Sequence, residues 1–340
     1  MKVLKYMQMA TIVAALGFVS CNSDDIPQIG DADIQIIASI GDVKTRVNSE
    51  DDGSKFLPGD TLYIRSNNTG AEVNVKTVPY ITKNGTIDGV AEFQPVLEKL
   101  CWIDYNKQTF IAYNSGRLNF TNNFSNTTSY DCLSINYGDY EIASDQTTVE
   151  KLRTEDIILG NYRRLDYFST NGVVSFNMRH IFSKVTVTIK EYRGFDNPGK
   201  DGFEIKNVVI NSNELKNDYY LYYMDGDENF AKYKGWGVRT PSANKISISP
   251  LKKEDKTNGK HSFTAIIAPY PYATGDVFMS FEFQGVTYKV LANSDLCSQD
   301  FLQEGKHYHF ELTINKKASV NMSKVSLIGW EEEEFTKFGS

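Results

Sequence analysis

The sequence has few of the residue types on which enzyme and metal sites depend. It contains only four histidines and four cysteines among 340 residues. No G-x-S-x-G nucleophile elbow, glycine-rich phosphate loop or H-E-x-x-H zinc motif occurs. Nothing singles out a pair of catalytic carboxylates among the 43 acidic residues. The sequence therefore predicts no catalytic residue, no metal and no cofactor, and it favours a binding or structural role over an enzyme.

Cysteine spacing and positive charge exclude two further classes of protein. The cysteines stand at positions 21, 101, 132 and 297, which fits neither a disulfide framework nor a zinc signature, and at most one pair, such as Cys101 with Cys132, is able to bridge. The net charge is −7. Because nucleic-acid binding relies on clustered lysine and arginine, we expect no nucleic acid among the partners.

No apolar run is long enough to cross a membrane as a helix. The stretch from Met9 to Val19 falls short of the roughly 20 residues that a bilayer requires. Lys2 and Lys5 precede it and Ser20 follows, so residues 1–20 have the form of an export signal that is removed. A small residue directly before Cys21 resembles the lipobox of bacterial lipoproteins. This resemblance implies acylation of Cys21 and an anchor in the outer membrane. The alternative is an ordinary export signal with a chance cysteine.

Residues 21–33 have the composition of an acidic tether. Ser23, Asp24 and Asp25 follow Cys21 closely, and such a run resembles the surface-export signal of Bacteroidetes lipoproteins. A plain hydrophilic tether is the other interpretation. The mature chain of about 320 residues exceeds what one hydrophobic core usually organises. We therefore expect two domains, at residues 34–184 and 185–340.

Helical periodicity is nearly absent, and Thr147 to Leu159 is the one segment that predicts a short helix. Lys184 to Lys190 alternates apolar and polar residues, which predicts a strand with one face in a core and one in water. Val277 to Leu291 predicts a hairpin that turns at Gln284 and Gly285. Other predicted strands are 34–40, 62–65, 110–113, 173–176, 203–210, 246–249, 263–268 and 308–315, while 119–130 is predicted as a polar loop. The pattern indicates an all-β protein of two tandem antiparallel β-sandwich domains.

The histidines are assigned structural or solvent-facing roles. His307 and His309 lie two residues apart at a predicted strand, so their side chains share one face, which we expect to face solvent. Such a pair can also bind a metal, but no acidic or thiol partner is identifiable nearby. His180 is expected to be a buried, hydrogen-bonded structural residue.

Tyrosine is concentrated in one short segment, Tyr219 to Tyr223, and Trp236 follows soon after. Tyrosine and tryptophan combine a large apolar surface with a polar tip, which suits recognition of protein or carbohydrate. On a strand, Tyr220 and Tyr222 share one face. We therefore predict a ligand surface for a host protein or a glycan at Tyr220, Tyr222 and Trp236. The alternative is that the cluster packs between the sheet and its loops.

Several short motifs occur in a fixed order along the chain. They include T-R at 45–46, F-L-P-G-D at 56–60, F-x-M-x-H-x-x-S-K-V at 176–185, I-A-P at 267–269, G-K-x-Y-x-F-x-L-T at 305–313 and I-G-W at 328–330. With the lipobox, this order resembles that of the fimbrillin family, the Bacteroidales type V pilins and their relatives. The resemblance implies two transthyretin-like β-sandwich domains and a role in adhesion at the cell surface.

The resemblance also implies a route of maturation. Precursors in the family travel as lipoproteins, and an arginine-specific protease then cuts after an arginine that follows the first strand, a position that Arg46 fits here. Loss of strand 34–40 would leave a groove that the C-terminal segment of a neighbouring subunit fills. The candidate donor is Ser319 to Phe338, although the acidic run Glu331 to Glu334 departs from an apolar donor. The alternatives are an uncut arginine and a last strand that stays in its own domain, as in an anchor, tip or stand-alone relative.

A function of a different class is also compatible with these features. A stand-alone surface lipoprotein that binds glycans for a nutrient-uptake system would also be all-β and rich in aromatic residues. The sequence does not decide between this and the fimbrial subunit.

Overall fold

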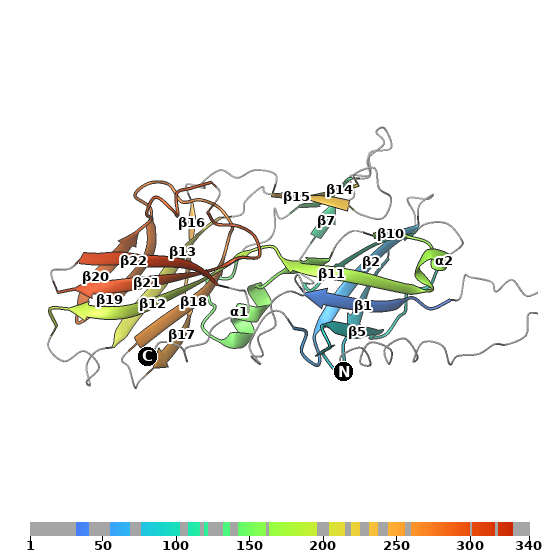
Figure 1. Cartoon of the computed structure of the whole chain (residues 1–340), viewed down its shortest axis with the longest axis horizontal. Helices are drawn as coiled ribbons and strands as arrows, with labels where there is room; N and C mark the ends of the chain where they lie inside the picture. The colour runs from blue at the N-terminus through green and yellow to red at the C-terminus, as the bar shows by residue number, and fades with distance from the viewer. Residues whose placement is uncertain are drawn as a thin grey trace, which may run out of the picture.

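The computed structural model describes residues 32–40, 55–68, 76–102, 108–115, 119–121, 132–136, 142–160, 163–195, 204–214, 219–224, 231–236, 244–255, 260–299, 301–316 and 319–328. Within these ranges the protein is all-β, as predicted, with two short helices, α1 (Val149–Glu155) and α2 (Tyr167–Thr170). The sheets lie along an elongated body (Figure 1). Helix α1 falls inside the predicted segment, and its N-cap is Thr148, whose Oγ1 accepts a hydrogen bond from the backbone N–H of Lys151 at 3.2 Å.

The first sheet contains nine strands from the N-terminal half of the chain. They are β1 (Gln35–Ile40), β2 (Thr61–Asn68), β3 (Lys76–Ile81), β4 (Thr86–Ile87), β5 (Val90–Pro95), β6 (Gln108–Tyr113), β9 (Ile158–Gly160), β10 (Arg163–Leu165) and β11 (Val173–His180). Their order is β1-β11-β9-β6-β2-β3-β5-β4, with β10 on β6. Because β1 also pairs with β5, the strand order closes into a ring.

Three strands of this ring, β3, β5 and β9, were not predicted as strands from the sequence, and β9 begins inside the segment that was predicted as a helix, Thr147 to Leu159. β3 contains Pro79, which has no backbone N–H to donate, and such a residue usually argues against a paired strand. Here Pro79 lies opposite Tyr63 of β2, and its carbonyl accepts a hydrogen bond from the backbone of Val96 at 3.1 Å. In β5, only Ala91 and Phe93 point into the core. Two buried residues in six give too weak a pattern to identify a strand.

Two sheets from the C-terminal half pack around a second hydrophobic core. The five-stranded sheet has the order β17-β18-β12-β21-β22, and the four-stranded sheet has the order β16-β13-β19-β20. The bounds are β12 (Ser183–Arg193), β13 (Ile205–Asn213), β16 (Lys245–Ile248), β17 (Leu251–Asp255), β18 (Lys260–Ile267), β19 (Val277–Phe283), β20 (Val286–Leu291), β21 (His307–Asn315) and β22 (Ser319–Ile328). The predicted hairpin is confirmed as β19 and β20, and both its turn residues have positive φ, 50° at Gln284 and 71° at Gly285.

The face of β12 that was expected to lie in water is buried. Val185, Val187 and Ile189 face the core as predicted, but Thr186 and Thr188 on the other face are only 2% and 6% exposed. Thr186 Oγ1 lies 2.9 Å from Thr264 Oγ1 of the neighbouring β18. The alternation of apolar and polar residues was therefore wrongly taken to mean a solvent-facing side. Buried threonines that hydrogen-bond to a neighbouring strand give the same alternation.

A small fourth sheet joins strands from both halves of the chain, with the order β15-β14-β8-β7. It consists of β7 (Asn119–Thr121), β8 (Cys132–Asn136), β14 (Tyr219–Met224) and β15 (Ala231–Trp236). The start of the predicted polar loop at 119–130 is thus a strand. Because β8 pairs with β14 across the predicted boundary at 184/185, the division into domains 34–184 and 185–340 stays a prediction.

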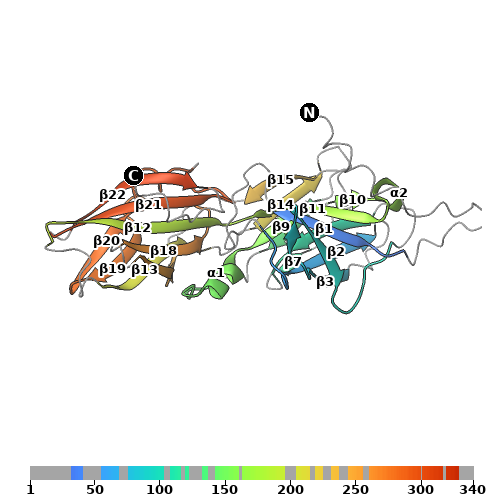
Figure 2. The same ribbon diagram turned by 60° about the horizontal axis from the view of Figure 1, so that its bottom comes forward.

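Two strand pairs are parallel in a protein that was predicted to be antiparallel. β1 runs parallel to β11, and β12 runs parallel to β21. β11 and β12 follow each other along the long axis, separated only by Ile181 and Phe182 (Figure 2). Both of these residues are 0% exposed. One nearly continuous stretch of chain therefore carries a parallel neighbour in each half.

A second connection between the halves is made by Gln146, which is 0% exposed. β17 pairs with β18 only as far as Thr264, so the backbone of Ile266 lies beyond the end of β17. There the Gln146 side chain takes the place of a strand. Its Nε2 donates to the Ile266 carbonyl at 3.0 Å, and its Oε1 accepts from the Ile266 N–H at 2.8 Å. The Gln146 backbone N–H donates to the backbone carbonyl of Ser249 at 2.9 Å.

Replacing Gln146 with alanine is expected to destabilise the protein by about 2 kcal/mol, because the buried N–H and C=O of Ile266 would lose their partner. Urea unfolding of the purified protein measures this. Thr147→Ala, one residue further along and exposed, is the control and should change stability by less than about 0.5 kcal/mol. Equal effects of the two substitutions would contradict the role given to the Gln146 side chain.

Candidate functional site

The most distinctive site in the structure is the position of β1 between two other strands (Figure 1). β1 pairs parallel with β11 from Gln35 opposite Val173 to Ile40 opposite Met178. On its other side it pairs antiparallel with β5, where Ile36 lies opposite Phe93. Among the described strands, β1 alone connects β11 to β5. Without it both strands would expose unpaired backbone groups, and the ring of strands would open.

One face of β1 is part of the N-terminal core. Ile34, Ile36 and Ala38 are 5%, 1% and 1% exposed and belong to the same buried cluster as Phe93 and Phe176. Burial of the two isoleucines contributes about 3–6 kcal/mol, at about 1.5–3 kcal/mol per side chain. A strand that replaced β1 would therefore need apolar residues at every second position.

Backbone hydrogen bonds fix the point at which β1 enters the sheet. The N–H of Ile34 donates to the carbonyl of Leu100 at 3.1 Å, and the N–H of Trp102 donates to the carbonyl of Ala32 at 3.0 Å. On the other side, the N–H of Gln35 donates to Gly172 at 3.1 Å. These bonds set the register of the strand at its N-terminal end. The C-terminal end, Ile40, is six positions before Arg46, which lies outside the described residues.

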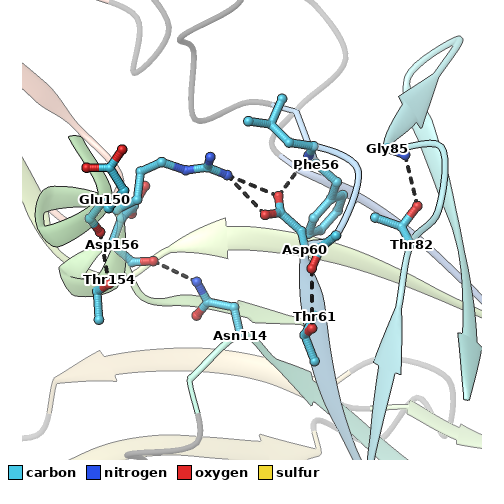
Figure 3. Close-up of polar contacts among 12 residues, drawn as sticks. Phe56, Asp60, Thr61, Thr82, Gly85, Asn114, Glu150, Thr154 and Asp156 are labelled. Carbon is cyan, nitrogen blue, oxygen red and sulfur yellow. Dashed lines mark hydrogen bonds and ion pairs between the residues drawn. The ribbon is translucent and has the colours of Figure 1, made fainter. Parts of the chain in front are cut away.

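The F-L-P-G-D motif forms the turn that starts β2 (Figure 3). Asp60 Oδ2 accepts a hydrogen bond from the N–H of Leu57 at 2.7 Å, and the Asp60 N–H donates to the Leu57 carbonyl at 3.0 Å. The motif is tied to the β3–β4 turn because Phe56 accepts from the N–H of Thr86 at 2.8 Å and donates to Thr86 Oγ1 at 2.8 Å. The F-L-P-G-D motif, which was noted as a family resemblance, thus forms one turn and holds a second turn beside it.

Helix α1 is attached to the same turn through Asp60. Arg153 Nη2 donates to both carboxylate oxygens of Asp60, at 3.1 and 3.2 Å (Figure 3). The two side chains are 47% and 31% exposed, so the pair is worth no more than about 1 kcal/mol. Its main effect is to orient α1 relative to the start of β2.

His180 is a buried structural histidine, as expected. It is 6% exposed, and its Nδ1 lies 2.6 Å from Asp156 Oδ1. The carbonyl of Asp156 accepts from Asn114 Nδ2 at 2.8 Å (Figure 3). Asn114 Oδ1 accepts from the N–H of Ile158 at 2.9 Å. The end of β11 is therefore fixed to the segment that follows α1, at the point where the chain passes into β12.

The expected solvent-facing position was wrong for His307, whereas His309 is partly buried. His307 is 0% exposed, and its Nε2 lies 2.8 Å from Thr186 Oγ1. His309 Nε2 lies 2.8 Å from Thr188 Oγ1 in the same way. In the parallel register of β12 with β21, Lys184 lies opposite His307 and Thr186 lies opposite His309, so each threonine bonds to a histidine diagonal to it. These imidazoles belong to the polar network between strands, and sequence spacing alone could not reveal the threonine partners.

The residues of the predicted ligand surface lie on the paired strands β14 and β15. Tyr220 lies opposite Trp236 of β15 and opposite Ile135 of β8. Tyr222 lies opposite Tyr233 of β15. The three predicted residues are thus neighbours on one pair of strands, and their role in binding stays a prediction.

The other predicted sites have the following positions. Cys21, like Arg46, is outside the described residues. Cys101 and Cys297 are free thiols. Over the described ranges, no three histidine, cysteine or acidic side chains gather closely enough to bind a metal ion. No helix in the same ranges is long and apolar enough to cross a membrane.

Replacing Gly85 with alanine is expected to destabilise the F-L-P-G-D turn more than the same change at Gly89. Both glycines have positive φ, 67° and 86°, so both substitutions carry the left-handed backbone cost of about 1–2 kcal/mol. A Cβ at Gly85 would also lie 2.5 Å from the Phe56 carbonyl oxygen, whereas a Cβ at Gly89 would meet nothing within 4 Å. Thermal unfolding of the two variants should show the larger loss for Gly85→Ala, and equal losses would mean that the turn relaxes without cost.

Solved structures from Bacteroides share this fold. A candidate cell adhesion protein from Bacteroides uniformis ATCC 8492 matches 88% of this chain and 98% of its own, with a TM-score of 0.52 and 18% sequence identity. A second, from Bacteroides ovatus ATCC 8483, matches 89% of this chain and 99% of its own, with a TM-score of 0.50 and 16% identity. Identities this low show the fold alone. No curated protein sequence matches the chain.

The family is shown by the sequence itself. A family model described as fimbrillin-like matches residues 45–330, which include the F-L-P-G-D turn, the segment through His180 and the whole of β22. The match spans well over half of the chain and agrees with the resemblance found from the motifs. The chain belongs to the fimbrillin-like family.

Proposed function

We propose that the protein is a cell-surface fimbrial subunit or accessory protein that travels as a lipoprotein and takes up a strand from a neighbour at the position of β1. Membership of the fimbrillin-like family supports a fimbrial role at the cell surface rather than catalysis. In this proposal Cys21 carries the lipid during export to the outer membrane. Cleavage after Arg46 then releases the segment that contains β1.

The observation that carries this proposal is the placement of β1. β1 is the first of the described strands, it closes the ring and its segment buries alternate apolar residues, so its removal would not require any other described strand to be unthreaded. Its removal would leave backbone groups of β11 and β5 and an apolar groove, which together form a template for an incoming strand. The incoming strand would find a parallel partner in β11 and an antiparallel partner in β5.

The candidate donor is the C-terminal segment, Ser319 to Phe338. Its first part, Ser319 to Ile328, is β22 and pairs antiparallel with β21 in the same chain. Val320 and Met322 are partly buried against the C-terminal core. Donation of this part would require β22 to leave β21, so an unassembled subunit holds its donor in its own sheet. If β22 never leaves, the protein acts as an acceptor at the end of a fibre.

Two finer features complete the proposal. The chain would consist of tandem transthyretin-like sandwich domains, at residues 34–184 and 185–340. Adhesion to a host protein or a glycan would use Tyr220, Tyr222 and Trp236, whose strands β14 and β15 lie between the two halves in Figure 1. The register that makes these residues neighbours supports a common surface.

Cleavage after Arg46 is expected to convert the purified precursor into a form that binds donor strands. Treatment with an arginine-specific protease, followed by a synthetic peptide of residues 319–338, should give a complex that resists SDS. Arg46→Lys keeps the charge but removes the cleavage site, so this control should bind no peptide. Cleavage at Arg46 without peptide binding or multimers would overturn strand exchange. A persistent monomer that is retarded in polysaccharide gels would instead support the glycan-binding alternative.

Cys21→Ala is expected to abolish lipid attachment, because the thiol is the acylation site in this proposal. The variant should lose metabolic labelling with palmitate and should shift from the detergent phase to the aqueous phase in cells that export it. Cys101→Ala, which removes a free thiol from the folded part, is the matched control and should keep both properties. Labelling that survives in Cys21→Ala would place the lipid elsewhere.

A further inference from the structure

The ends of β13 and β16 bring a lysine directly against an asparagine amide. These strands are antiparallel neighbours, and Asn213 lies opposite Lys245 in their register (Figure 1). Lys245 Nζ donates to Asn213 Oδ1 at 2.7 Å. Asn213 is 1% exposed, and the Lys245 side chain is 17% exposed. A nucleophilic nitrogen and a carboxamide are therefore held together away from bulk water.

The orientation of the Asn213 amide is fixed by two carbonyl groups. Its Nδ2 donates to the backbone oxygens of Tyr270 and Pro271, both at 3.1 Å. An amide turned the other way would place oxygen against two oxygens, so Oδ1 must face Lys245. Since a C=O bond is about 1.23 Å long, Lys245 Nζ lies no more than about 3.9 Å from the Asn213 carbonyl carbon. This is close to the contact distance from which an attack begins.

A carboxylate completes the group. Asp276 Oδ2 lies 3.0 Å from Lys245 Nζ. Asp276 is fixed in a turn, because its Oδ2 accepts from the N–H of Ala273 at 2.9 Å and its carbonyl accepts from the N–H of Ala292 at 2.9 Å. It can therefore take a proton from the lysine without moving far, and it can return that proton to a leaving group.

Aromatic side chains cover the group on one side. The Tyr272 ring centre lies 5.8 Å from Lys245 Nζ, and Tyr272 is 2% exposed. Burial raises the pKa of the Tyr272 phenol, so it stays neutral. Its hydroxyl donates to the carbonyl of Asn211 on β13. Because the buried Tyr272 ring excludes water on this side, it strengthens the electrostatic contacts between the lysine, the amide and the carboxylate.

We propose that Lys245 and Asn213 become joined by an isopeptide bond, with Asp276 as the proton-transfer residue. The Lys245 ammonium gives a proton to Asp276, and the resulting amine attacks the Asn213 carbonyl carbon. The new C–N bond forms as the old C–Nδ2 bond breaks. Asp276 delivers the proton that it holds to Nδ2, which leaves as ammonia, and then takes up a proton from the attacking nitrogen. The reaction exchanges one amide for another, so it needs no oxidant, metal or nucleotide.

Such a bond would close the base of the segment that carries β14 and β15. Residues 214–244 lie between the two linked positions and include the tyrosine-rich strand β14 and its neighbour β15. A weaker closure lies just beyond the linked pair, where the N–H of Glu214 donates to the Asn244 carbonyl at 3.3 Å and Asn244 Nδ2 donates to Glu214 Oε2 at 2.9 Å. A covalent link there would prevent the segment from pulling β13 and β16 apart.

Mass spectrometry of the intact, denatured protein tests the bond. The expected mass is lower than the sequence mass by one ammonia, and tryptic digestion should yield a single species that contains both the Asn213 and Lys245 peptides. Loss of ammonia without a joined peptide would indicate a succinimide at some asparagine and would overturn the proposal. A full mass with two separate peptides would also overturn it and would leave the group as an ion pair with hydrogen bonds.

Three variants assign the roles. Lys245→Arg keeps the charge but should restore the full mass, and Asn213→Asp should change the loss from one ammonia to one water. Asp276→Asn should lower the joined fraction at least tenfold, and a fully joined Asp276→Asn protein would exclude the carboxylate from the reaction. The control is Lys252→Arg, at a lysine of β17 whose Nζ donates to the Ile205 carbonyl at 3.5 Å, and it should keep the mass deficit. The wild-type mass decides the question even if a variant fails to fold.

Discussion

The pairing of β1 with β11 and β5 is the interaction on which the N-terminal half depends. It pairs directly with two strands that do not pair with each other, and its segment supplies Ile34, Ile36 and Ala38 to the core. β1 is also the first of the described strands along the chain. Its two pairings close the ring of strands, so the ring depends on a strand being present at this position.

The connection between the halves uses buried polar side chains as well as apolar ones, since Ile111, Leu152 and Leu159 of the N-terminal half belong to the C-terminal core. Gln146 completes the backbone bonding of Ile266, and His180 with Asp156 fixes the end of β11. Gln146 and His180 are buried, so each would leave unsatisfied partners behind if it were withdrawn. Buried polar contacts have strict geometry. They therefore define one arrangement of the halves, whereas apolar packing alone would tolerate several.

The fold was predictable where one face of a strand is apolar and the other polar, as in β11 and the β19–β20 hairpin. It was not predictable where the partner decided the outcome. Pro79 concealed β3 because a proline argues against pairing, although its carbonyl still accepts a bond. Thr186 and His307 look like a wet face in sequence but are buried against each other. The parallel pairing of β1 with β11 joins residues more than a hundred positions apart, and no local pattern contains such information.

The candidate sites divide along the same line. The position of β1 was expected from the family resemblance, and the structure adds its two neighbours and their opposite directions. The group of Asn213, Lys245 and Asp276 was missed, because an asparagine, a lysine and an aspartate at unrelated spacings form no motif. Only the register of β13 with β16 and the turn at Ala273 bring them together.

The two-residue link between β11 and β12 has a mechanical consequence. Because these strands follow each other along the long axis (Figure 2), tension along the body would pass from one sheet to the other through Ile181 and Phe182. The hydrogen bonds between β12 and its neighbours β18 and β21 run across that direction, so they would be loaded together in shear instead of opening one after another. The body is thus arranged to resist stretching at the two residues that join β11 to β12.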